Sequence, residues 1–301
     1  MTTGVTVRVP AKVNLYLGVG PKQFTGFHNL ATVFQSVSIY DEITIAPAES
    51  FEIKPAGVFA NAIPVDQSNL VWKAVELVAK ACGEDPHLSV TINKAIPVAA
   101  GMAGGSADAA AALVACDSYW QAGLSRSQID AMAKILGSDV PFMLHGGCAL
   151  GTGRGDVLAP IMTRGKFHWV FATFDQGLST SAVYERFDKV SMLSDEYVPE
   201  VPSEVLGALA HADAHALGDS LHNDLQSAAL TLRPGLADTM EFGLDHGALG
   251  TVVSGSGPTC AFLAKDEASA LDLRVALSSS GLADGAIHAH GPVHGARIVL
   301  H

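Results

Sequence analysis

At residues 97–108 the sequence reads Pro97-Val98-Ala99-Ala100-Gly101-Met102-Ala103-Gly104-Gly105-Ser106-Ala107-Asp108. The alternating run before it, 88–94, predicts a β-strand, and the alanine-rich run after it, 108–116, predicts a buried helix. Small residues let a loop backbone approach a ligand closely, and the first N–H groups of a helix lack partners within the helix. This order favours a phosphate-binding site. A tight turn before a core helix would explain the same residues, so the rest of the chain must decide.

Length and composition limit the classes of function. The chain has 301 residues, of which 49% are hydrophobic and 16% are charged, which suits one large domain or two ordinary ones. The formal net charge of −12 argues against nucleic acid or an anionic membrane as a partner. No apolar run reaches the ~18 residues of a membrane helix, and the first residues lack a signal-peptide pattern, so we expect a cytoplasmic protein. The four scattered cysteines are expected to be buried free thiols.

The region before the loop predicts antiparallel strands at 5–9, 10–17, 30–39 and 43–46, with a turn at Asp41-Glu42. Period-two geometry places Lys12 and Asn14 on one face of a strand. That face is either a solvent-exposed edge or the wall of a polar site. Phe27 and His28 stand at a loop exit, where they either hold a planar ligand or cap the edge of the core.

The region after the loop predicts alternating helices and strands. A helix over 69–81 has Ser68 as its N-cap and Gly83 beyond its end, and Ser125 opens a second helix with a capping box. Asp139 stands at the start of a short helix, where it is either a cap or a chemical group. Further helices are predicted at 204–211, 220–230, 235–245 and 266–278, with strands at 168–173, 251–254, 259–264 and 296–300. We expect two domains, 1–160 and 161–301.

Three features together indicate phosphoryl transfer: a phosphate-binding loop, the strand lysine Lys12 and the aspartate Asp139. This reaction needs the transferred phosphate held, its charge neutralised and the accepting hydroxyl aligned. A lysine beside an aspartate favours the ionised carboxylate, which can accept the hydroxyl proton. Ser106 can offer its hydroxyl to phosphate or to magnesium (Mg2+). The loop contains no Gly-Lys-Ser/Thr and no Rossmann spacing.

The loop resembles the Pro-x-x-x-Gly-Leu-Gly-Ser/Gly-Ser-Ala/Ser motif of the GHMP kinases, a family that includes galactokinase, homoserine kinase and mevalonate kinase. Four other segments match in order along nearly the whole chain. They are Pro10-Ala-Lys-Val-Asn-Leu15, Gly26-Phe-His-Asn-Leu30, Gly137-Ser-Asp-Val-Pro141 and Gly255-Ser-Gly-Pro258. Together these segments narrow the resemblance to family members that act on a substrate linked to cytidine diphosphate.

The resemblance implies a two-domain α+β fold. The N-terminal domain would be similar to domain two of ribosomal protein S5, and the C-terminal domain would be ferredoxin-like. It also implies the reaction, in which ATP phosphorylates the 2-hydroxyl of a cytidine-diphosphate-linked methylerythritol on the non-mevalonate route to isoprenoid precursors. Magnesium would accompany ATP.

The resemblance assigns roles to residues. Lys12 and Asp139 would be the catalytic pair, with Asp139 as the base, and residues 97–107 would bind the triphosphate. Asn14 would line the substrate pocket near the hydroxyl, and Asn69 would face the adenine side. Three residues would hold the cytosine: Phe27 by stacking, His28 by hydrogen bonds, and Tyr184 as a second aromatic ring.

The sequence departs from the family pattern at two places. Phe27 replaces the usual tyrosine, which keeps the ring and loses a hydroxyl. Alanines replace glycines at 99, 100 and 103, where close approach requires a negative φ and flexibility falls. Alternatives to the cytidyl-linked kinase are another GHMP kinase acting on a small alcohol or sugar, a nucleotide-binding regulator without activity, and a purely structural protein. An intact Lys12 and Asp139 argue against the regulator.

Overall fold

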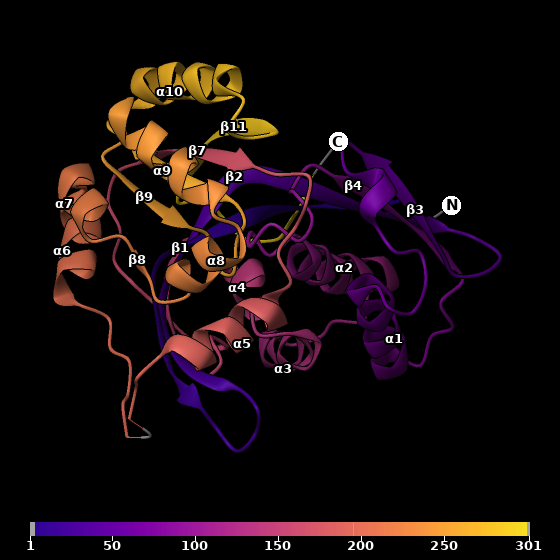
Figure 1. Cartoon of the computed structure of the whole chain (residues 1–301). Coiled ribbons are helices and arrows are strands. Elements are labelled where there is room, and N and C mark those ends of the chain that lie inside the picture. The colour runs from indigo at the N-terminus through magenta and orange to yellow at the C-terminus, as the bar shows by residue number, and fades with distance from the viewer. Residues whose placement is uncertain (1–3, 195, 300–301) are drawn as a thin grey trace.

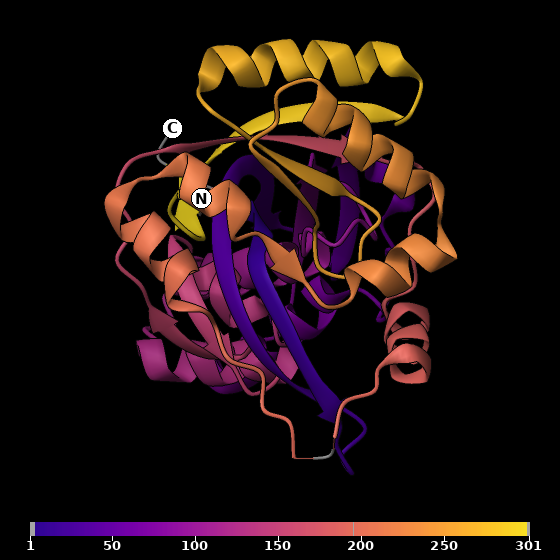
Figure 2. The ribbon, with the colours of Figure 1, turned by 60° about the vertical axis from the view of Figure 1, so that its left-hand side comes forward.

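The computed structural model describes residues 4–194 and 196–299, and its spine is a pair of very long antiparallel strands. Strand β1 (Val5–Lys22) pairs with β2 (His28–Pro47) along almost its whole length. Figure 2 shows the two indigo strands running through the molecule to a protruding hairpin. The predicted turn at Asp41-Glu42 is therefore wrong. Strand β2 continues through both residues, and Asp41 is fully buried.

Six more strands complete the first sheet around this pair. The continuous strand order is β12-β1-β2-β4-β3, while β5 pairs with β2 and β6, and β8 pairs with β1. These strands are β3 (Glu52–Gly57), β4 (Leu88–Lys94), β5 (Cys148–Thr152), β6 (Val157–Pro160), β8 (His222–Asn223) and β12 (Arg297–Ile298). The predicted strand at 88–94 is confirmed, and a tight turn over 153–156 joins β5 to β6.

Helices from the first half of the chain cover this sheet, some in direct contact with its strands and others packed on those helices (Figure 1). They are the short 3-10 helix η1 (Ala60–Ala62) and the helices α1 (Leu70–Cys82), α2 (Gly104–Trp120), α3 (Arg126–Leu136) and α4 (Val140–His145). The predicted capping box of Ser125 and Gln128 is confirmed at the start of α3. The N-cap of α1 is Asn69 rather than the predicted Ser68.

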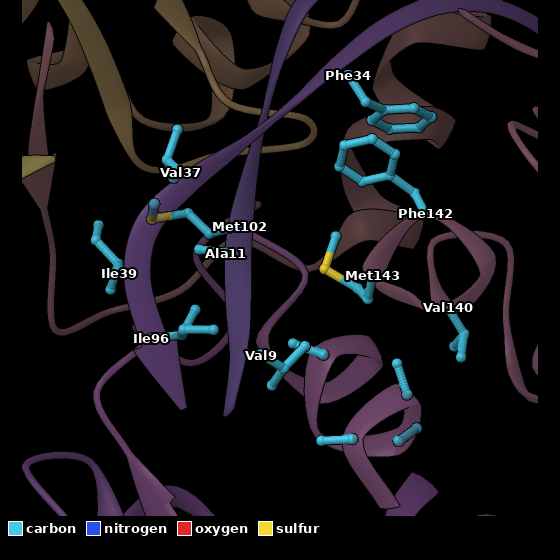
Figure 3. Close-up of a cluster of buried hydrophobic side chains, with 14 of the residues drawn as sticks. Val9, Ala11, Phe34, Val37, Ile39, Ile96, Met102, Val140, Phe142 and Met143 are labelled. Carbon is cyan, nitrogen blue, oxygen red and sulfur yellow. The ribbon is translucent and has the colours of Figure 1, made fainter. Parts of the chain in front are cut away.

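The core of this half is built from β-branched strand residues and the alanines of α2. Helix α2 is apolar on every side, and its buried residues are mostly alanines, so the helix axis comes close to the strands that it covers. Phe34 of β2 and Phe142 of α4 stack at 4.9 Å between ring centroids (Figure 3). Met102 and Ala11 lie in the same cluster, so the end of the glycine-rich loop is part of the core.

The second half contains a separate four-stranded antiparallel sheet. Its order is β11-β7-β10-β9, from β7 (Phe167–Thr173), β9 (Gly250–Val253), β10 (Cys260–Ala264) and β11 (Gly285–Gly291). With α10 (Glu267–Ser280) between β10 and β11, this is the βαββαβ order of a ferredoxin-like domain, as the family resemblance implied. Trp169 and Phe171 face the core of the first half, while Val170 and Ala172 face α10 and α9 (Gly235–Asp245).

Four short helices connect the two sheets: α5 (Thr180–Val190), α6 (Ser203–His211), α7 (Ala214–Asp219) and α8 (Gln226–Leu232). The predicted helix at 220–230 is confirmed only in its second part, because α8 begins at Gln226, whereas residues 222–223 form β8 beside Tyr16 and Leu17 of β1. The side chain of Asn223 donates to the carbonyls of Val253 and Gly255, and its Oδ1 atom accepts the N–H of Leu225, a local bond that competes with helix formation. The strand β11 was also not foreseen.

The predicted domain boundary at 160–161 falls between β6 and β7, which belong to different sheets. Strands β8 and β12, from beyond that boundary, return to the first sheet and pair with β1. The division into 1–160 and 161–301 therefore stays a prediction.

A buried cluster of charges joins the first sheet to α2. The ammonium of Lys94 contacts Asp41 at 2.5 Å and Asp108 at 2.6 Å, and all three side chains are almost fully buried. The other oxygen of Asp41 accepts hydrogen bonds from the backbone N–H groups of Ala95 and Ile96. Burial raises the pKa of Asp108 to about 8, even though Lys94 opposes this shift. The cluster holds the two ends of the glycine-rich loop, because Lys94 precedes that loop and Asp108 follows it.

Replacing Lys94 by methionine leaves two buried carboxyl groups without their cation. We expect Lys94→Met to lower the free energy of unfolding by about 3–5 kcal/mol, as measured by urea denaturation. Glu42→Gln removes the neighbouring, partly exposed pair with Arg8, and we expect it to cost less than about 1 kcal/mol. Similar losses in the two variants would contradict a structural role for the buried cluster.

Candidate active site

One cavity of about 1020 Å³ brings together residues from both halves of the chain. Most of the predicted site residues line it: Lys12, Asn14, Phe27, His28, Ala99, Ala100, Gly101, Ala103, Gly104, Gly105, Ser106, Asp139 and Tyr184. Others lie behind its wall or beside it: Pro97, Val98, Met102, Ala107 and Asn69. The cavity is large enough for two substrates of nucleotide size.

A chain of hydrogen bonds positions Lys12 and Asn14 on β1. The Lys12 ammonium donates to Asn14 Oδ1 at 2.6 Å, and Asn14 Nδ2 donates to Thr32 Oγ1 at 2.8 Å. The Thr32 hydroxyl donates to the carbonyl of Tyr16, which fixes the orientation of the Asn14 amide. Both Lys12 and Asn14 are buried in the protein, so the alternative of a solvent-exposed edge is wrong.

Asp139 lies opposite Lys12, with 3.9 Å between its Oδ2 atom and Lys12 Nζ. It occupies the N-cap position of α4, but its side chain makes no capping hydrogen bond. The carboxylate is therefore not used to stabilise the helix and is available inside the cavity. Burial lowers the pKa of Lys12, and the charge of Asp139 opposes this shift.

The two small-residue loops pack against each other, backbone to backbone. Gly101 has φ +76°, and a Cβ atom there would lie 1.9 Å from the carbonyl oxygen of Ser254. The Ser254 hydroxyl donates to the carbonyl of Gly101 at 3.1 Å. A Cβ atom on Gly255 would lie 3.1 Å from Lys12 Nζ. Glycine is therefore required where the second loop meets the first loop and the lysine.

The glycine-rich loop ends at the N-terminus of α2, where Gly104, Gly105 and Ser106 form the first helical residues and line the cavity. Free N–H groups and the helix dipole make this end suitable for an anion. The condition of a negative φ is not met by two of the three substituted alanines. Ala99 has φ +51° and Ala103 has φ +59°, a region that costs a non-glycine residue of order 1 kcal/mol or more.

Aromatic and charged side chains form the other end of the cavity, at the β1–β2 hairpin and α5. Phe27 is 54% exposed, and the guanidinium of Arg154 lies over its ring at 5.1 Å. His28 is buried, 4.9 Å from the ring of Tyr184 between centroids. This end offers flat apolar surfaces next to hydrogen-bonding groups, which suits a planar heterocycle.

Asn69 is held by the structure of α1. Its Oδ1 atom accepts the N–H of Val71 as the N-cap, and its Nδ2 group donates to the carbonyl of Pro64. The neighbouring Leu70 lines the cavity, whereas Asn69 does not. A role toward adenine stays a prediction.

Three charged groups near the site were not identified from the sequence. Asp188 and Arg154 line the cavity, and Lys94 supports the loop from below. Lys94 is the last residue of a largely buried strand and lies just before the loop. A lysine at this position of the sequence could have indicated a buried charge that supports the loop. Asp188 gave no such signal, because its distance from His28 in the sequence is 160 residues.

Metal-binding clusters, membrane-spanning helices and the state of the cysteines can also be assessed from the described residues. Within residues 4–194 and 196–299, no group of three or more His, Cys, Asp or Glu side chains could hold a metal ion. No helix among the same residues is long and apolar enough to cross a membrane. The four cysteines are free thiols, as predicted, but only three of them are buried, because Cys82 is half-buried.

Comparisons with known proteins agree with this architecture. Residues 69–147 match the family model described as GHMP kinases N terminal domain, and residues 205–282 match GHMP kinases C terminal. A relative from Mycolicibacterium gilvum (strain PYR-GCK), named 4-diphosphocytidyl-2-C-methyl-D-erythritol kinase, is 50% identical over 99% of this chain and 94% of its own length. A relative of the same name from Mycobacterium tuberculosis (strain ATCC 25618 / H37Rv) is 49% identical with the same coverage.

Solved structures give the same result. A crystal structure of 4-(cytidine 5'-diphospho)-2C-methyl-D-erythritol kinase has a TM-score of 0.78 at 28% identity, covering 94% of this chain and 98% of that one. Homoserine kinase from Cytophaga hutchinsonii has a TM-score of 0.75 at 17% identity, with coverage of 99% and 98%. At that identity the second likeness shows the fold alone.

The positive φ of Ala103 predicts that glycine is better accommodated there. We expect Ala103→Gly to raise the free energy of unfolding by about 0.5–1 kcal/mol, because glycine adopts this conformation without strain. Ala100, three residues earlier, is buried and does not have a positive φ. We expect Ala100→Gly to lower the same quantity by about 1 kcal/mol. Equal effects in urea denaturation would show that the two alanines do not differ in strain.

The lowered pKa of Lys12 predicts a dependence of stability on pH. Between its folded value and the ordinary 10.5, the unfolded state binds more protons at this residue than the folded state. The contribution of Lys12 to the free energy of unfolding therefore rises with pH through this window. It is lost again as the pH falls from 10.5 to the folded value. We expect the difference in unfolding free energy, wild type minus Lys12→Met, to increase with pH there. A flat or falling difference in urea denaturation would show that burial does not lower this pKa.

Proposed function

Because the chain belongs to the GHMP kinases and, within them, to the 4-diphosphocytidyl-2-C-methyl-D-erythritol kinases, we propose that it acts on the substrate of that name. It is an ATP-dependent kinase that phosphorylates the 2-hydroxyl of the methylerythritol unit in the methylerythritol phosphate pathway. The observation that carries the proposal is the single cavity, which has an anion-binding loop, a lysine–aspartate pair and an aromatic end in one space.

We propose that Asp139 is the general base and Lys12 its catalytic partner. Both face the cavity next to the glycine-rich loop, so a hydroxyl bound between them would lie in line with a phosphate on the loop. Asp139 would accept the hydroxyl proton as the hydroxyl oxygen bonds to the γ-phosphorus of ATP, while the bond from that phosphorus to the β-phosphate oxygen breaks and ADP leaves. The Lys12 ammonium would offset the negative charge on the transferring phosphoryl group. Asn14 orients Lys12 and, as proposed from the family, lies near the accepting hydroxyl.

We propose that residues 97–107 hold the triphosphate through the backbone N–H groups at the start of α2. The side chain of Ser106 provides an oxygen ligand for Mg2+ on the same surface. The described residues lack a cluster of metal-binding side chains, which fits an ion carried chiefly by phosphate oxygens. Bound Mg2+ would neutralise phosphate charge. A cytoplasmic location and the absence of a nucleic-acid partner stay predictions.

We propose that the aromatic end of the cavity binds cytosine. Phe27 and Tyr184 supply stacking surfaces, and His28 supplies hydrogen bonds. The loss of a hydroxyl at Phe27 is compensated in part by Arg154, because the guanidinium over the ring restricts where the ring lies.

A substrate panel tests the proposal directly. ATP consumption is measured with the cytidine-diphosphate-linked substrate, with free methylerythritol and with mevalonate. We expect activity on the first alone. Equal activity on mevalonate, or none on the cytidyl substrate, would overturn the proposal.

Asp139→Asn keeps the shape of the side chain and removes the base. We expect kcat to fall by about 100-fold or more, while binding of a non-hydrolysable ATP analogue stays measurable by calorimetry. Asp130→Asn makes the same chemical change on α3, outside the cavity lining, and serves as the control. Unchanged turnover in Asp139→Asn would remove this residue from the mechanism.

A further inference from the structure

The histidine at the aromatic end of the cavity is held by a carboxylate that the function described above does not use. His28 Nε2 lies 2.7 Å from Asp188 Oδ1, across 160 residues of sequence. Asp188 is on the last turn of α5, and its second oxygen lies 3.9 Å from the Lys22 ammonium. The contact joins the β1–β2 hairpin to the second half of the chain.

The packing around His28 restricts the plane of its ring. Tyr184 lies against it at a tilt of 34°, and Phe187 meets it edge to face at 6.2 Å between centroids. The His28 side chain is only 6% exposed, yet the residue lines the cavity. A ring held by two aromatic neighbours and a carboxylate presents one fixed edge to a ligand.

The chemistry of the pair decides what that edge offers. A carboxylate can only accept a hydrogen bond, so Nε2 must carry the proton that it donates to Asp188. In a neutral imidazole the other nitrogen then has a lone pair. Among the described residues, His28 Nδ1 has no hydrogen-bond partner. The free edge of the ring is therefore a hydrogen-bond acceptor that a ligand can reach.

The bases of the pyrimidine nucleotides differ at this point. Cytosine carries an amino group at position 4, which donates hydrogen bonds, whereas uracil carries a carbonyl oxygen there, which only accepts. Given the proposed function, on which this step rests, we propose that Asp188 is a positioning residue that keeps His28 as an acceptor. His28 Nδ1 thereby accepts a hydrogen bond from the 4-amino group of cytosine and rejects uracil.

The sharpest test compares cytidine-linked and uridine-linked forms of the substrate. We expect the wild type to favour the cytidine form in kcat/KM by about 100-fold or more, because a uracil carbonyl would face an acceptor without a proton between them. In Asp188→Asn the partner can accept or donate, so His28 is free to take either tautomer. We expect this preference to fall by about 10-fold or more, with the loss on the cytidine substrate seen in KM more than in kcat.

Two further variants separate positioning from general damage to the fold. Asp188→Glu keeps a carboxylate and should restore at least part of the preference. Lys189→Gln removes a charge from the same helix at an exposed residue outside the cavity lining, and should leave the preference unchanged. A preference that is the same in Asp188→Asn and in the wild type would overturn the proposal.

Nitrogen NMR of the His28 ring provides a readout that does not depend on catalysis. In the ligand-free wild type near neutral pH we expect Nε2 protonated and Nδ1 unprotonated. In Asp188→Asn we expect a mixture of tautomers. A proton on Nδ1 in the wild type, in either the neutral or the doubly protonated ring, would overturn the proposal.

Binding of free CDP and UDP distinguishes failure of this proposal from failure of the proposed function. If the enzyme does not phosphorylate the cytidyl substrate, the proposed function fails. A preference for CDP over UDP that depends on Asp188 would still support the assignment of His28 and Asp188, and equal affinities for CDP and UDP would refute it.

Discussion

The buried contact between Lys94 and its two carboxylates is the interaction on which the site depends. It ties β2, β4 and α2 together at the point where the glycine-rich loop begins and ends. A Cβ atom on Gly104 would lie 2.9 Å from the Lys94 ammonium, so the first residue of α2 rests directly on this charge. An isolated buried charge is costly, and the ammonium of Lys94 is tolerable because two carboxyl groups surround it. The geometry of the loop is therefore set by charge pairing beneath it.

A second level of organisation joins the two halves of the chain. The carbonyls on either side of Ser254 accept hydrogen bonds from one buried amide, that of Asn223, while Ser254 itself contacts Gly101. The loop that meets Lys12 is thus held from behind by the polar segment around β8. The glycine-rich loop, Lys12 and the second glycine loop form one connected unit, although more than 240 residues of sequence separate Lys12 from Gly255.

Local sequence patterns correctly predicted the features that depend on residues close together in the sequence. The capping box at Ser125, the glycine end of α1 and the alternating strand β4 all depend on neighbours in the sequence, and all were found as expected. The errors occurred where distant groups decide. Asp41 looked like a turn residue because its partner Lys94 lies 53 residues away, and 222–223 looked helical because its backbone partners lie in β1. The family motifs predicted that Lys12 and Asp139 act as a pair. Only the fold shows that the Asp139 side chain makes no capping hydrogen bond and that Asp188 contacts His28.

The return of β8 and β12 to the first sheet has a mechanical consequence. Both strands cross from the second half of the chain to pair with β1, and the Trp169 indole donates to Gln35 of β2 in the buried interface. Swinging the two halves apart about a hinge would break backbone pairing at two places along the edge of β1 opposite β2, and would expose that interface. We therefore expect no hinge opening between the two halves of the chain. Substrates must enter and products must leave past the exposed rim of the cavity, such as the hairpin that carries Phe27, without separation of the two halves.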